Sequence, residues 1–175
     1  YAFGTGAMLL MALAICWATL WLTWIRWFFI APAIIGITMA ARAKPPDLLI
    51  DRSGQGAAFF SADGRLTILG QPSSFTSAFW LQAAGDLRRT NDATLRAKTR
   101  CDLLGCTGTD TSGRIVAWVK DARAFPEDCQ RAHLIITPLS VPDWCNDPMI
   151  ADRTTLASHG AMTVRWHNDT PAITS

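Results

Sequence analysis

Charge is almost missing from the first forty-one residues of the chain, where Arg26 is the only charged side chain. A helix exposed to water needs a charged or polar face, so we interpret residues 1–41 as a membrane segment. Ala7 to Ile25 is a nineteen-residue stretch without charge, close to the roughly 20 residues that cross a bilayer. A second apolar run, Trp27 to Ala41, is short for a full span.

Two arrangements fit these runs. In the first, they form a helical hairpin that turns at Thr23–Trp27, and in the second, one helix spans the membrane while the other lies partly in the interface. We favour the hairpin over both this alternative and a pair of core helices in a soluble protein. The chain starts at Tyr1 rather than Met, so we expect a fragment, a processed product or the tail of a longer protein.

The remaining residues lack any large excess of one charge. From Arg42 onward there are 15 Lys and Arg against 14 Asp and Glu, which gives no general electrostatic argument for strong nucleic-acid binding. Pro45–Pro46 marks the boundary, because proline ends a helix. We expect one soluble domain over residues 42–167 and a flexible tail over 168–175.

Short apolar runs separated by turn residues predict a mostly β or α+β sandwich in this domain. The Asp63–Gly64 pair predicts a hairpin turn. A helix is predicted over 74–84, where Phe75, Phe79 and Trp80 are spaced to share one face. A second helix is predicted over 90–99, capped by Thr90 or Asn91. Strands are expected at residues 48–50, 57–61, 66–69, 114–120, 134–136, 149–151 and 162–166.

Five cysteines occur, of which Cys16 lies in the apolar run and is expected to be a small buried hydrophobe. The other four form an even set that suggests two disulfides, although free thiols and a zinc site stay open as alternatives. Proximity in sequence favours Cys101–Cys106 and Cys129–Cys145.

Two features of the sequence predict opposite orientations of the domain relative to the membrane. Arg42, Lys44 and Arg52 follow the second apolar run and would place the domain in the cytoplasm. Two disulfides would instead place it in an oxidising compartment, and we adopt this periplasmic interpretation.

One basic cluster occurs in the domain, diluted by Asp86 and Asp92 and with no aromatic residue between its members. A solvated face is therefore the simpler interpretation, and nucleic-acid contact the alternative. The candidate DNA contacts are Arg88, Arg89, Arg96, Lys98 and Arg100.

Signatures of catalysis are missing. His133, His159 and His167 have no common metal-ligand spacing, and neither a phosphate-binding loop nor a serine-nucleophile motif occurs. Ser158 and His159 are neighbours in sequence, which by itself does not indicate a catalytic triad. We therefore predict no catalytic residue, metal ligand or cofactor.

Several stretches nevertheless resemble, in their order, the C-terminal end of the ComEC-type competence proteins. They read KPPDLLIDRSGQGAAFFSADGRLTIL, CDLLGC, EDCQRAHLIITPL and LASHGAMTVRW. That family passes single-stranded DNA through the bacterial inner membrane during transformation, and its soluble C-terminal domain is similar to metallo-β-lactamases. The resemblance implies membrane helices followed by an α+β domain. It also implies three partners: the membrane, the rest of the same channel protein and single-stranded DNA.

The chain departs from that family where the metal would bind. Gly54–Gln55–Gly56 matches the family's opening, but Ala57 stands where an acidic residue is usual, and the family's H-x-H-x-D-H loop has no counterpart. The resemblance thus implies a degenerate metallo-β-lactamase-like sandwich that lacks the metal site and acts as a non-catalytic part of a DNA-uptake channel. Two alternatives stay open: a metal-dependent nuclease or hydrolase with atypical ligands, and a membrane-anchored periplasmic interaction domain.

Overall fold

The chain was analysed as a computed structural model that describes residues 5–21, 23–42, 46–61, 63–167 and 170–174. It divides into two compact units, residues 1–45 and 46–175.

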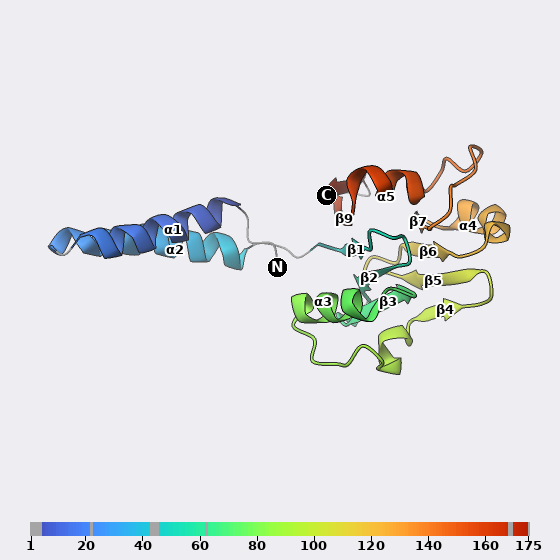
Figure 1. Cartoon of the computed structure of the whole chain (residues 1–175), viewed down its shortest axis with the longest axis horizontal. Helices are drawn as coiled ribbons and strands as arrows, with labels where there is room; N and C mark the ends of the chain where they lie inside the picture. The colour runs from blue at the N-terminus through green and yellow to red at the C-terminus, as the bar shows by residue number, and fades with distance from the viewer. Residues whose placement is uncertain (1–4, 22, 43–45, 62, 168–169, 175) are drawn as a thin grey trace. The chain divides into compact units, whose positions relative to one another are not determined.

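The first unit consists of two helices and a short connecting turn (Figure 1). Helix α1 spans Thr5–Leu20, a 3-10 turn η1 spans Trp24–Phe29, and helix α2 spans Ile30–Ala41. The two helices pack against each other with small residues at the contact. A Cβ added to Gly36 would lie 3.3 Å from Met11 Cγ. The outward side chains of both helices are mostly large and apolar.

The prediction of membrane helices is wrong, because no helix in the described ranges is both long and apolar enough to cross a membrane. Helix α1 has 16 residues and α2 has 12. At 1.5 Å per residue these are about 24 Å and about 18 Å long, against an apolar core of about 30 Å. The uncharged run Ala7–Ile25 does not form one helix, since α1 ends at Leu20 and Thr23 is extended with φ −89° and ψ 175°.

The second unit contains two five-stranded sheets (Figure 1). The first sheet is antiparallel throughout, in the order β10-β9-β1-β2-β3. Its strands are β1 Leu48–Ile50, β2 Gly56–Phe60, β3 Leu66–Gly70, β9 Met162–His167 and β10 Thr170–Thr174. Residues 170–174 were expected to be flexible, but they pair with β9 at the edge of the sheet, where Pro171 is tolerated.

The second sheet has the order β4-β5-β6-β7-β8, with β6, β7 and β8 parallel and the other pairs antiparallel. Its strands are β4 Thr99–Cys101, β5 Gly105–Thr109, β6 Ile115–Val119, β7 Leu134–Ile136 and β8 Met149–Ala151. Helix α4, Phe125–Arg131, follows the 3-10 turn η3, Ala122–Ala124, and helix α5 spans Arg153–His159. No helix was predicted over the residues of α5, but Asp152 caps its first turn by accepting a hydrogen bond from Thr155 N at 2.9 Å.

Both sheets are covered on both faces, which gives the order helix, sheet, sheet, helix. Alternate residues of β2 show this: Phe59 belongs to the apolar cluster between the sheets, and Ala58 to the cluster under helix α3, Ser74–Ala84. On β6, Trp118 faces the first sheet and Val119 packs under α4 with Phe125. The domain is therefore an α+β domain with two sheets.

Candidate functional site

The basic cluster lies on the connection between the two sheets, residues 86–101, which we call the cationic segment. Helix α3 ends at Gly85, whose φ of 69° is left-handed, and the chain then turns back along β3. A 3-10 turn, η2 Ala93–Arg96, follows, and β4 completes the segment. Leu95 is buried in the apolar cluster with Leu66 and anchors the segment to the first sheet. The helix predicted over 90–99 is not formed.

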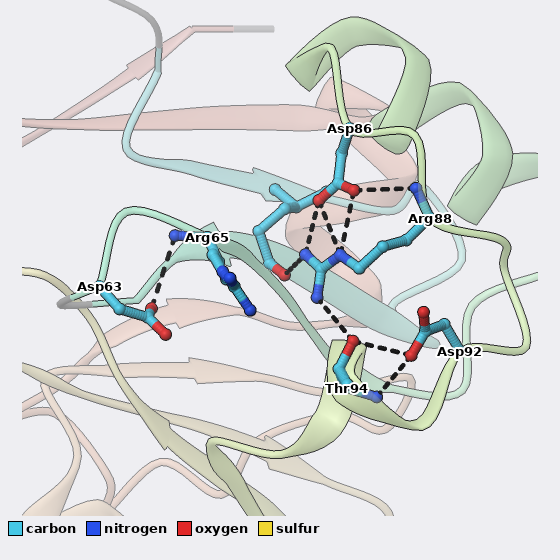
Figure 2. A network of polar contacts seen from close by, with 7 residues as sticks. Asp63, Arg65, Asp86, Arg88, Asp92 and Thr94 are labelled. Carbon is cyan, nitrogen blue, oxygen red and sulfur yellow. Dashed lines mark hydrogen bonds and ion pairs between the residues drawn. The ribbon is translucent and has the colours of Figure 1, made fainter.

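Arg88 holds the segment in place through a network of polar contacts (Figure 2). Its Nη2 lies 2.5 Å from Asp86 Oδ2, and its Nε donates to Asp86 Oδ1 at 3.0 Å. The same Nη2 donates to the carbonyl of Leu66 on β3 at 2.6 Å, and Nη1 donates to Thr94 Oγ1 at 3.1 Å. Thr94 in turn donates to Asp92. One guanidinium thereby joins the end of α3, strand β3 and η2.

This network changes the charge of the segment as well as its shape. The hydrogen bond from Arg88 lowers the pKa of Asp86, and the hydrogen bonds from Thr94 lower the pKa of Asp92. Asp86 and the Arg88 guanidinium are mostly buried and neutralise each other. Arg88 is therefore a structural residue, and it is not available for a phosphate.

Arg88→Gln is expected to destabilise the domain by about 1–3 kcal/mol, because the Leu66 carbonyl and a carboxylate both lose a charged donor. The ion pair keeps the pKa of Asp86 below its ordinary 3.8. A depressed folded-state pKa stabilises the fold above the unfolded pKa, and this contribution is lost as the pH falls through the folded value. The stability difference from wild type should therefore be largest near neutral pH and shrink below about pH 4.

Urea unfolding at pH 7 and pH 3 measures this difference. Arg123→Gln is the matched control, because it breaks an Arg–Asp pair whose arginine side chain is 77% exposed. It should cost less than about 0.5 kcal/mol. Equal losses in the two variants would contradict the structural role of Arg88.

The other four cations of the segment, Arg89, Arg96, Lys98 and Arg100, are exposed. None of the four forms an ion pair with any described residue. The segment carries five Lys and Arg against two Asp, whereas the rest of residues 46–175 carries eight against twelve. Positive charge is thus concentrated on this segment of an otherwise acidic domain.

A shallow groove lies beside the segment, between helix α3 and the loop that follows it. Ala78 and Gln82 of α3 line one side, and residues 85–91, including Arg89, line the other. Phe75 and Phe79 lie on the same exposed face of α3 as Ala78 and Gln82. Phe75 is 83% exposed and Phe79 is 61% exposed. The prediction that they share a face with the core residue Trp80 is wrong, because Trp80 and Leu81 lie in the apolar cluster over the first sheet while the two phenylalanines are exposed.

The Gly54–Gln55–Gly56 turn forms a packed junction between the sheets. The buried Trp118 of β6 donates its Nε1–H to the carbonyl of Gly54 at 2.9 Å. Gly54 has a φ of +67°, and a Cβ there would lie 2.7 Å from the carbonyl oxygen of Thr137. Gly70 has a φ of +79°, and a Cβ there would lie 2.8 Å from the Trp118 ring. The sequence alone did not predict this close approach.

Groups that could bind a metal do not come together among the described residues, where no three His, Cys, Asp or Glu form a cluster. The structure pairs Cys101 with Cys106 and Cys129 with Cys145. The ring of His133 accepts a hydrogen bond from Ile115 N at 3.2 Å. Ser158 Oγ lies 2.9 Å from His159 Nδ1 at the exposed end of α5, but the described contacts of this pair are to α5 backbone carbonyls, with no carboxylate to orient the imidazole.

Comparisons with known protein families, with curated proteins and with solved structures found no match to this chain. The resemblance to the ComEC-type family rests on the sequence motifs alone. The predicted fold class, membrane helices followed by a degenerate metallo-β-lactamase-like sandwich, is contradicted: the structure shows an α+β domain with two sheets and no membrane-spanning helix among the described residues. The membrane and competence assignments are set aside with it.

Proposed function

We propose that residues 46–175 form a non-catalytic domain that binds single-stranded DNA through Arg89, Arg96, Lys98 and Arg100. The observation that carries the proposal is the exposure of these four cations, without ion pairs to described residues, on a single segment of an otherwise acidic domain. Cationic side chains that neutralise phosphates release the counterions condensed on the nucleic acid, so binding is favourable and depends on salt.

The rigid support of the segment favours binding over a merely solvated face. Arg88 fixes the loop to β3, Leu95 anchors η2, and the Cys101–Cys106 disulfide joins β4 to β5. Cations held on a fixed backbone lose less conformational entropy on binding than cations on a free loop. The two disulfides are typical of an oxidising compartment, and we place the domain in one.

Replacing the four cations by glutamine, R89Q/R96Q/K98Q/R100Q, should weaken binding of labelled oligo-dT by at least about tenfold at low salt and flatten its salt dependence. The control variant K120Q/R123Q/R131Q/R153Q removes the same charge from exposed positions on or near α4 and α5. This control variant should bind oligo-dT with an affinity close to that of wild type. Fluorescence anisotropy over a range of salt concentrations measures both variants, and equal losses in the two would overturn the proposed site.

A further inference from the structure

We infer that Phe75 and Phe79 are stacking positions for two unpaired bases of the strand whose phosphates contact the cationic segment. This inference rests on the proposed function and adds the part of the ligand that is recognised besides its charge. Both rings are large, apolar and mostly exposed, at 83% and 61%. Exposed aromatic side chains on one face of a helix lower the solubility of a protein, and such a surface is typical of a binding site.

The two rings are placed to act together. They stand four residues apart on α3, so their Cβ atoms are about 5–6 Å apart on one face of the helix. Ser73 caps this helix by accepting a hydrogen bond from Thr76 N at 3.1 Å, and Trp80 and Leu81 fix its opposite face on the sheet. The rings therefore sit on a rigid element rather than on a loop.

The exposed face of α3 that carries these rings borders the groove beside the cationic segment. Ala78 and Gln82, which share this face with the two rings, line the groove on one side, and Arg89 lines it on the other. A strand that lies in the groove and continues onto the exposed face of α3 meets a guanidinium and then the two flat apolar rings. An unpaired nucleic-acid strand offers the complementary groups, because its bases expose their faces and its phosphates are anionic. A duplex hides the base faces, and an inorganic polyanion has none.

The test uses the whole chain with the variant F75L/F79L, which keeps apolar, helix-compatible side chains but removes the rings. The control variant W144L removes an exposed aromatic ring that is 59% accessible and lies beside Cys145, on the side of the domain covered by α4. Two probes are compared by anisotropy: labelled oligo-dT of about 12 nucleotides and an abasic oligomer of the same length.

We expect F75L/F79L to weaken oligo-dT binding by about tenfold or more, to leave abasic binding unchanged, and to keep the salt dependence of wild type. W144L should bind both probes like wild type. If F75L/F79L binds oligo-dT as tightly as wild type, the stacking inference is overturned while the proposed function stands. If the wild-type chain shows no salt-dependent binding of either probe, the stacking inference and the proposed function are both overturned.

Discussion

Trp118→Ala is expected to lower the free energy of unfolding by about 3–5 kcal/mol, the range found when large buried aromatic side chains are truncated. The ring is 3% exposed and packs between the two sheets. It also donates the hydrogen bond to the Gly54 carbonyl, which would be left buried without this partner.

Urea unfolding followed by circular dichroism measures this effect. Trp144→Ala removes the same side chain from a site where it is 59% exposed and should change stability by less than about 0.5 kcal/mol. Trp118→Phe keeps most of the ring volume and removes the donor, so it should lose less stability than Trp118→Ala. Similar stabilities for the Trp118→Ala and Trp144→Ala variants would contradict the packing of the sheets described here.

Removal of the Cys129–Cys145 disulfide by a double substitution to alanine should cost about 3 kcal/mol. The bond joins residues 16 apart, and loop-closure entropy in the unfolded chain predicts this loss. Cys129, on α4, and Cys145 are both nearly fully buried in one apolar cluster, so the substitution also removes apolar contacts. The bond ties the end of α4 to the loop before β8 across the intervening strand β7.

The matched comparison is Cys101→Ala with Cys106→Ala, which opens a disulfide between residues only 5 apart. That double variant should lose about 2 kcal/mol, because a shorter loop constrains the unfolded chain less. Thermal unfolding of the two variants and of the reduced wild type gives the order of stability. Mass spectrometry after alkylation gives the bond count, and finding free thiols at Cys129 and Cys145 in oxidised protein would contradict the predicted cost.

Local patterns in the sequence predicted much of the second unit. The Asp63–Gly64 turn between β2 and β3 and the apolar run 134–136 of β7 required no long-range information. Helix α3 was also predicted with the right boundaries, from the spacing of its aromatic residues. Phe75 and Phe79 were wrongly predicted to lie on the buried face of α3. The spacing of apolar residues predicts that a helix has an apolar face, but it does not show which part of that face the sheet covers.

Other elements depend on partners far away in the chain. Residues 90–99 were predicted to be helical, but the bond from Arg88 to Leu66 and the pairing of Cys101 with Cys106 leave room only for the 3-10 turn η2 before strand β4. Strand β10 forms because β9 offers it an edge. The first apolar run was read as one span because hydropathy averages over the break after Leu20.

The candidate site likewise depends both on local sequence patterns and on contacts between distant residues. The basic residues were visible in the sequence as a cluster, yet only the structure separates Arg88, which is used within the fold, from the four cations that face solvent. The contact between Trp118 and Gly54 joins residues 64 apart in the sequence, and no local sequence pattern predicts it. Its only trace in the sequence is the glycine pair at 54 and 56.

The salt dependence of oligo-dT binding by the wild-type chain tests the central claim most directly. Four phosphate contacts to a single strand predict that the logarithm of the association constant falls with the logarithm of the salt concentration with a slope of about −2.8. A slope near this value, lost in the four-cation variant and kept in its control, is the result we expect. Absence of saturable binding at low salt, or a slope near zero, would contradict the account.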